Sequence, residues 1–251
     1  MPTSLPARIR LAARRRQLRG APRPRHVGLV MDGNRRWARL AGFADARVGH
    51  RAGAEHVGDV LRWATTWGID HLTVYVLSAD NIRKRPVAEV DHLMTLLEEI
   101  VPEQVLAHPR WCAHVSGDER LLPSTTRESL AQLVDATRGR PAHVTLAIAY
   151  DGHEDIVTGI RAALIAAAET RNLSIGEDDV TRGLPGGPVK EIDLVIRTSG
   201  EQRLSGFFPW QASNAQIVLS PKLWPAFTEV DFADALAEFA RSSDRRHRMA
   251  G

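Results

Sequence analysis

The fold is decided by one stretch near the N-terminus, His26-Val27-Gly28-Leu29-Val30-Met31-Asp32-Gly33-Asn34-Arg35-Arg36-Trp37. Its apolar first half predicts a buried strand over His26–Met31, and a helix is expected over Asn34–Leu40. In an α/β sheet, ligands bind beyond the carboxyl ends of the strands, where the next helix presents free backbone N–H groups. The turn between the two elements is therefore a candidate anion site.

The residues of this turn suit a phosphate that arrives with a cation. Gly33 lets the backbone approach an anion closely, and Arg35 and Arg36 offer charge-assisted hydrogen bonds. Asp32 would repel a bare phosphate, so its presence indicates a bridging divalent cation, for which Mg²⁺ is the natural choice. A capped turn with solvated arginines explains the same residues equally well, so the residues alone leave both interpretations open.

Strand-like and helix-like segments alternate along the rest of the chain. Further strands are expected at Leu72–Leu77, His114–Ser116, Val144–Tyr150, Leu194–Thr198 and Gln216–Leu219. Helices are expected at Ala52–Trp67, Val87–Leu106, Asp155–Glu169 and Phe232–Phe239, and a capping box over residues 125–128 would open another. Such alternation predicts the α/β class, with a mostly parallel central sheet covered by helices. The order of the strands does not follow from it.

Composition indicates one globular domain behind a basic segment. The chain has 251 residues, of which 43% are hydrophobic, enough for one sizeable core. Residues 1–25 hold eight arginines and no acid, whereas the other 25 basic residues face 30 acidic ones. We expect a flexible N-terminal arm over 1–25 and a single domain over 26–251. Leucine and isoleucine spacing in the arm also permits a short amphipathic helix in weak contact with a membrane surface.

Several classes of protein are disfavoured. No apolar run is long enough to span a bilayer, and the single Cys112 cannot form an internal disulfide, so a cytoplasmic location is expected. The sequence has no glycine-rich nucleotide loop, nucleophile elbow or regular cysteine–histidine metal spacing. The basic arm has no aromatic platform or reading motif, so we expect no nucleic-acid partner.

Four motifs resemble those of the cis-prenyltransferases, the family that includes undecaprenyl diphosphate synthase. They are Met31–Arg39, Gly49–Gly53, Ser78–Asn81 and Asp193–Ser205, and Phe207, Trp210-Gln211 and Leu223-Trp224-Pro225 extend the likeness. The resemblance covers His26 to Arg246. It implies a magnesium-dependent prenyl diphosphate synthase with an apolar tunnel, acting on allylic and homoallylic diphosphates. It also implies a homodimer in which a neighbour's C-terminal segment completes each site.

The resemblance also implies roles for individual residues. Asp32 would hold Mg²⁺, and His50 and Asn81 would act beside the donor diphosphate in ionisation and proton loss. Gly33, Asn34, Arg36 and Arg47 would bind the donor diphosphate, and Arg197, Arg203 and Ser205 the acceptor diphosphate. The other expected substrate-binding residues are Arg35, Trp37, Val76, Ser78, Lys84 and Arg85. Long-chain members have alanine where this chain has Val76, so a short product of two or three five-carbon units is expected.

The departures from the family pattern concern the acceptor. Gln216 stands where relatives have a metal-binding glutamate, Arg246-His247-Arg248 lacks the usual glycine, and Tyr150-Asp151-Gly152-His153 replaces Tyr-Gly-Gly-Arg. These changes suggest head-to-middle coupling of two allylic diphosphates, as in lavandulyl-type products. Regular cis head-to-tail condensation with isopentenyl diphosphate, giving a farnesyl-length product, remains the alternative. A non-catalytic partner subunit is a second alternative, but such subunits lose the Asp32 equivalent and keep the glycine motif.

Overall fold

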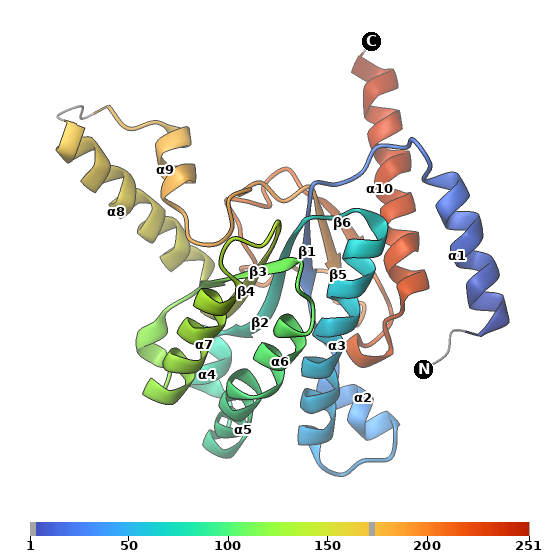
Figure 1. Cartoon of the computed structure of the whole chain (residues 1–251), viewed down its shortest axis with the longest axis horizontal. Coiled ribbons are helices and arrows are strands. Elements are labelled where there is room, and N and C mark those ends of the chain that lie inside the picture. The colour runs from blue at the N-terminus through green and yellow to red at the C-terminus, as the bar shows by residue number, and fades with distance from the viewer. Residues whose placement is uncertain (1–3, 171–173, 251) are drawn as a thin grey trace.

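The computed structural model of the chain describes residues 4–170 and 174–250. Within these ranges, one sheet of six strands has the order β3-β4-β2-β1-β5-β6 (Figure 1). The strands are β1 His26–Val30, β2 His71–Ser78, β3 Trp111–Ser116, β4 Ala142–Tyr150, β5 Leu194–Arg197 and β6 Gln216–Leu219. All the strand pairs of this sheet are parallel. The predicted α/β class is confirmed.

Helices connect the strands as the alternation predicted. Their bounds are α1 Leu5–Gln17, α2 Asn34–Leu40, α3 Ala46–Trp67, α4 Ala79–Lys84, α5 Val87–Glu98, α6 Ile100–Leu106, α7 Ser124–Thr137, α8 Gly152–Thr170, α9 Glu177–Gly183 and α10 Glu229–Ala250. Short 3₁₀ turns lie at Glu119–Leu121 and Trp224–Ala226. Neither α4 nor α9, of six and seven residues, was predicted.

The two faces of the sheet are covered differently. On one face α3, α6, α7 and α10 bury a large apolar core, with Leu61, Val105, Leu133 and Leu236 among its members. On the other face a smaller cluster includes Tyr150, Phe207 and Phe208. Helix α8 projects from one end of the sheet with α9 beside it (Figure 1). The loop between β5 and β6, which carries several motif residues, therefore packs directly on the sheet.

The helix predicted over Val87–Leu106 is broken into α5 and α6 because of Pro102. Proline has no N–H to donate to the carbonyl four residues earlier, which is that of Glu98. The hydroxyl of Ser129 on α7 donates to this carbonyl instead, at 3.0 Å. The break is thus compensated by a neighbouring helix.

The predicted capping box is wrong. Helix α7 begins at Ser124, and Pro123 at its N-cap makes no side-chain cap. The hydroxyls of Thr125 and Thr126 both donate to a carboxylate oxygen of Glu98, at 2.9 and 2.5 Å. These two hydroxyls therefore bond to Glu98 of α5 and do not cap α7.

The N-terminal segment differs from the expected flexible arm. Residues Leu5–Gln17 form α1, which lies along α10 (Figure 1). Leu11 is buried, and Arg10 and Arg14 pair with Asp234 of α10 at 2.9 and 2.6 Å. The helix that the spacing permitted thus turns Leu11 onto the domain, whereas Leu5 and Ile9 stay exposed. Among the described residues, no helix has the length and apolar character that crossing a bilayer requires.

Candidate active site

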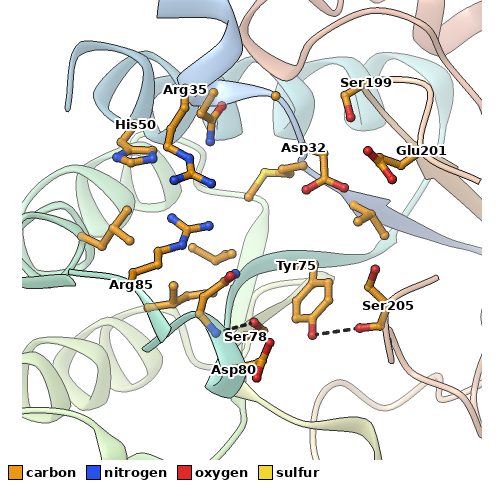
Figure 2. A pocket seen from close by; sticks show the side chains of 18 of the residues that line it. Asp32, Arg35, His50, Tyr75, Ser78, Asp80, Arg85, Ser199, Glu201 and Ser205 are labelled. Carbon is orange, nitrogen blue, oxygen red and sulfur yellow. Dashed lines mark hydrogen bonds between the residues drawn. The ribbon is translucent and has the colours of Figure 1, made fainter. Parts of the chain in front are cut away.

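A cavity of about 1200 Å³ opens at the carboxyl ends of β1, β2, β4 and β5. Its lining is strongly charged, with six arginines and four carboxylates: Arg35, Arg36, Arg39, Arg85, Arg197, Arg203, Asp32, Asp80, Asp151 and Glu201. Figure 2 shows Arg35, His50 and Arg85 on one side of the cavity, with Asp32, Ser199, Glu201 and Ser205 on the other. The cavity therefore has two polar regions, the first on the side of Arg35 and the second on the side of Asp32. Each has groups that suit an anion.

Arg197 organises the second of these regions. Its side chain is only 4% exposed, and both Nε and a terminal nitrogen contact Asp32 Oδ2, at 3.0 and 2.7 Å. The other terminal nitrogen donates to Ser205 Oγ at 3.1 Å. Thr198 Oγ accepts from the Asp32 backbone N–H at 2.9 Å and holds the end of β1 beside β5. Because a buried charge is costly unless paired, these contacts fix Arg197 in one position.

The loop after β5 folds back over the cavity through unusual backbone conformations. Ser199 and Ser205 adopt φ values of +73° and +52°, which side-chain-bearing residues rarely do. Within this loop Glu201 lies 3.7 Å from Arg203, and the backbone carbonyl of Ser199 accepts from Arg36 at 3.4 Å. Strain of this kind concentrates at ligand sites, where the surroundings hold it in place.

The first region is built around Glu89 at the start of α5. Its carboxylate lies 3.0 Å from Arg85, 3.8 Å from Arg35 and 3.6 Å from His50 Nε2. Burial, and next the Arg85 guanidinium, lower the pKa of His50 to about 4. The imidazole is therefore neutral at neutral pH and can donate or accept a hydrogen bond without carrying charge. Two arginines beside it supply the positive charge.

Glycines bring α3 onto the start of α2. A Cβ at Gly49 would lie 2.1 Å from the Asn34 carbonyl oxygen, and one at Gly53 would lie 2.5 Å from Asn34 Oδ1. Gly33 itself has φ +109° and packs against Leu223. These close approaches place Asn34 on the cavity wall. A side chain at either α3 glycine would push Asn34 away.

Three buried polar atoms of cavity residues have no hydrogen-bond partner within the described ranges. They are Asn34 Oδ1, His50 Nδ1 and Ser199 Oγ. Buried polar groups are nearly always paired, so unpaired ones that gather at one cavity point to a ligand that would satisfy them.

An apolar pocket of about 40 Å³ continues from the charged cavity between β2 and helices α3, α5 and α6. Both spaces are lined by Met31, Val76 and Leu93. Strand β2 has a register shift between Tyr75 and Leu77, so Val76 is the residue left out of the ladder. Such a bulge re-aims a side chain, and here it turns Val76 to the junction of the two spaces.

Most of the predicted site residues line this cavity. They are Asp32, Gly33, Asn34, Arg35, Arg36, His50, Val76, Ser78, Asn81, Arg85, Arg197, Arg203 and Ser205. Ser78 ends β2 and caps α4 by accepting from the Asn81 N–H at 3.0 Å, which holds Asn81 at the rim. Predicted residues from the ends of three strands and from three helices thus converge on one space.

Three predicted residues lie outside the lining. Trp37 stacks on Phe43 with ring centroids 6.4 Å apart, and Arg47 is an exposed residue paired with Asp45 at 2.7 Å. Lys84 is 75% exposed and pairs with Asp80 at 2.9 Å. The arginine before Pro86, Arg85, reaches the cavity where Lys84 does not, because one residue of helix α4 rotates the side chain to another face.

Sequence reasoning missed other cavity residues, including Arg39, Phe43, Tyr75 and Glu201. Burial, followed by the charges of Asp151, Asp32 and Asp80, raises the pKa of Tyr75 to about 12. Tyr75 was hidden in an apolar strand pattern. Glu201, by contrast, stands inside a motif and could have been selected as a charged neighbour of Arg203.

The residues that depart from the family pattern lie partly in the cavity lining and partly outside it. Asp151 and His153 line the cavity, and Asp151 accepts from the N–H groups of His153 and Glu154 at the start of α8. Gln216 lies at the beginning of β6, outside the cavity lining, with a buried Oε1 that has no partner among the described residues. The side chains of Arg246, His247 and Arg248 lie outside what the structure describes.

The site suits a divalent cation bound together with a phosphate. Both contacts from Arg197 go to the same oxygen of Asp32, and the Asp32 side chain is 40% exposed. Its other oxygen is free for a further ligand. Mg²⁺ is commonly held by one or two carboxylates with substrate phosphate oxygens and waters, so one exposed carboxylate beside a phosphate-sized basic region fits such an ion.

Comparison with known proteins gives consistent results. Residues 30–248 match the family model described as "Putative undecaprenyl diphosphate synthase". An isoprenyl transferase of Streptomyces fradiae is 42% identical over 92% of this chain and 93% of its own length. A (2Z,6E)-farnesyl diphosphate synthase of Mycolicibacterium smegmatis is 37% identical, covering 91% of this chain and 88% of its own. The crystal structure of lavandulyl diphosphate synthase from Lavandula x intermedia in complex with dimethylallyl diphosphate is also similar. It has a TM-score of 0.80 at 32% identity, over 86% of this chain and 95% of that one.

Proposed function

Because the chain belongs to the cis-prenyltransferase family, we propose that it is a short-chain prenyl diphosphate synthase. It would join an allylic diphosphate, dimethylallyl or geranyl, to a second five-carbon diphosphate with loss of diphosphate. The observation that carries this proposal is the charged cavity with two anion-suited regions that opens into an apolar pocket. Such a space fits two diphosphate headgroups and one short hydrocarbon tail.

The residues around Glu89 would bind the donor. Arg35 and Arg85 would hold its diphosphate and stabilise the negative charge that grows as the carbon–oxygen bond breaks. The resulting allylic cation is attacked by the double bond of the acceptor, after which the product loses a proton. Neutral His50, or Asn81 at the rim, would assist the departing diphosphate and that proton loss.

The residues around Arg197 would bind the acceptor diphosphate, with Arg203 and Ser205 as further donors. Asp32, which pairs with Arg197 in this region, would hold Mg²⁺, which when bound neutralises diphosphate charge. Asp32 and Arg197 would thereby set the distance between donor and acceptor. The reaction needs that distance fixed, because bond formation requires the reacting carbons in near contact.

We further propose that the apolar pocket accepts the growing chain and limits it to two or three five-carbon units. A cavity needs about 10–15 Å³ of this kind of volume to hold one water molecule. The pocket of about 40 Å³ therefore has room for roughly three water-sized groups. Val76 stands at its entrance and fills space that a smaller side chain would leave open. A long product would require the helices around the pocket to move apart.

For the coupling mode we propose head-to-middle joining of two allylic diphosphates. Gln216 is neutral and a poor ligand for Mg²⁺, so it would not grip an acceptor as the family glutamate does. An altered grip on the acceptor diphosphate is what presentation of a different carbon requires. The similarity to a lavandulyl diphosphate synthase, with a TM-score of 0.80, supports this mode.

Regular head-to-tail condensation is the second candidate, and a specific observation favours it. Several curated relatives carry the names of (2Z,6E)-farnesyl or short-chain Z-isoprenyl diphosphate synthases at 36–38% identity. Gln216 also lies outside the cavity lining in a single chain, so its effect depends on how two chains meet.

One experiment separates these candidates. Purified protein is incubated with Mg²⁺ and dimethylallyl or geranyl diphosphate, with and without isopentenyl diphosphate, and the dephosphorylated products are separated by chromatography. Branched product without isopentenyl diphosphate supports head-to-middle coupling, whereas strict dependence on it contradicts that mode and supports the regular one. An absence of product from every pair, with a folded protein, would instead support the non-catalytic subunit.

The assembly would be a cytoplasmic homodimer. Three exposed apolar residues of α8, Val157, Ile160 and Leu164, fall on one face of the helix, and Ile217 and Leu219 are exposed on the edge strand β6. Apolar faces of this kind support a protein interface. A weak contact between α1 and a membrane surface is also proposed, since Leu5 and Ile9 are exposed beside its arginines.

A further inference from the structure

A second cluster of reactive side chains lies at the amino ends of the strands, opposite to the end that carries the cavity. His26, His71 and His143 begin or nearly begin β1, β2 and β4 and are paired in register across the three strands. The rings of His71 and His143 are stacked, with centroids 5.2 Å apart and planes 8° from parallel. No step of the proposed reaction uses these residues.

Cys112 and His114 of β3 extend this row toward the edge of the sheet. They are two positions apart, so both point to one face, and His143 shares that face because it is the register partner of Cys112. One ligand atom from each of the three residues lies within 4.8 Å of the other two. His114 Nε2 and His143 Nδ1 are 3.0 Å apart.

We propose that Cys112, His114 and His143 bind a Zn²⁺ ion. Zinc ligands lie at about 2.0–2.1 Å for nitrogen and about 2.3 Å for sulfur, so tetrahedral geometry places two nitrogens about 3.3 Å apart. The separation of 3.0 Å between the two imidazole nitrogens is close to this value. Thiolate with two imidazoles is a ligand set that zinc prefers, and the fourth position would hold water.

The contact between the two imidazoles prepares them for a shared ion. His114 Nε2 and His143 Nδ1 face each other across a hydrogen bond, so a proton lies between them. Zinc would take the place of that proton. The Cys112 thiol would release its proton to solvent on binding.

The loop between α9 and β5 encloses the three proposed ligands, and the charge of Lys190 in that loop opposes the binding of a cation. A Cβ at Gly187 would lie 3.4 Å from His143 and 3.6 Å from His114, so the loop between α9 and β5 packs directly on both rings. Lys190 of that loop donates to the carbonyls of Pro185 and Gly186 and exerts a positive charge on His114. Replacement of this ammonium by a neutral side chain, as in Lys190→Gln, would therefore strengthen zinc binding.

The test is a titration of metal-free protein with Co²⁺, a coloured stand-in for Zn²⁺, with no diphosphate present. We expect a thiolate-to-cobalt charge-transfer band and tetrahedral absorption bands that saturate at one equivalent and disappear on adding Zn²⁺. A wild-type protein without the charge-transfer band would overturn the proposal.

Variants identify the ligands. Cys112→Ser should lose the charge-transfer band, and His143→Gln should weaken binding by about 100-fold or more, whereas His108→Gln, a histidine outside the cluster, should match the wild type. Equal bands in Cys112→Ser and wild type would also contradict the assignment. If Cys112→Ser does not fold, His114→Gln and thermal melting of the wild type replace it. Zn²⁺ at 100 times its Kd should raise Tm by roughly 5–10 °C relative to chelator-treated protein, and no rise would count against the site.

Discussion

At the scale of one side chain, Arg197 is held by contacts with two residues of the cavity. It is almost completely buried and its charge is balanced by Asp32, with Ser205 as a third partner. A bound phosphate would compete for the same guanidinium, so Asp32 would be released to a cation as the acceptor binds. The ion pair between Asp32 and Arg197 therefore prepares two groups for two ligands of opposite charge.

His50 makes the free energy of unfolding depend on pH. The unfolded chain takes up a proton at this imidazole near pH 6.5, whereas the folded chain does so only near pH 4. Between these values protons bind the unfolded state more, so the free energy of unfolding falls as pH falls from about 6.5 to about 4. His50→Asn should reduce this loss by about 2 kcal/mol, or roughly 4–8 °C in the Tm difference between about pH 7.5 and about pH 5.

The matched control for His50→Asn is His153→Asn, which removes a histidine whose side chain is 96% exposed. Thermal unfolding of both variants is followed at the two pH values. The control should keep the Tm difference of the wild type. An unchanged Tm difference in His50→Asn would mean that burial does not hold this imidazole neutral.

At the scale of elements, the packing of α3 on α2 positions Asn34. Gly53→Ala would bring a methyl group to 2.5 Å from Asn34 Oδ1, and the displaced amide would no longer face the donor. We expect a loss of at least about tenfold in kcat/KM. The overpacking penalty of about 1–3 kcal/mol outweighs the gain of about 1 kcal/mol that alanine brings to a helix.

Gly58→Ala on the same helix is the matched control for Gly53→Ala. Its methyl group would come closest to Gln104 Oε1 at 2.4 Å, the end of a flexible side chain that can rotate away, and would lie 3.4 Å from His108 Nε2. This variant should keep wild-type kinetics and melt at the same or a higher temperature. Equal kinetic losses in the two variants would show that α3 itself, rather than Asn34, is disturbed.

The bulge in β2 is a second element whose geometry bears on function. Val76→Ala should open the junction between the charged cavity and the apolar pocket and allow at least one more five-carbon unit in the product. Val74→Ala, on the same strand but in the core, should cost about 1–2 kcal/mol of stability and leave product length unchanged. Product chains are sized by chromatography, and a Val76→Ala product of wild-type length would remove the argument.

For the whole molecule, the sequence predicted the class and the position of the site better than its shape. The first strand and turn sufficed to place Asp32, Gly33 and the arginines, because a parallel sheet always gathers its carboxyl ends. The strand order and the bulge at Val76 depend on contacts between distant segments, which periodicity does not record. The break at Pro102 is local and could have been predicted, because a proline inside a helical pattern ends or kinks the helix. Lys84 and Arg85 are adjacent in the sequence, so the spacing of the motif could not decide which of the two side chains faces the cavity.

The proposed dimer can be tested at the apolar face of α8. Val157, Ile160 and Leu164 are 37%, 40% and 51% exposed in the single chain, an arrangement that a partner would bury. Leu164→Glu would place a charge in that interface and should raise the dissociation constant by at least about 100-fold, equivalent to about 2.7 kcal/mol. Ile9→Glu on α1, where the wild-type side chain is 63% exposed, should leave the dimer intact. Sedimentation velocity over a range of concentrations measures both. Specific activity of Leu164→Glu should rise with protein concentration if each site needs its neighbour, and a stable Leu164→Glu dimer would place the interface elsewhere.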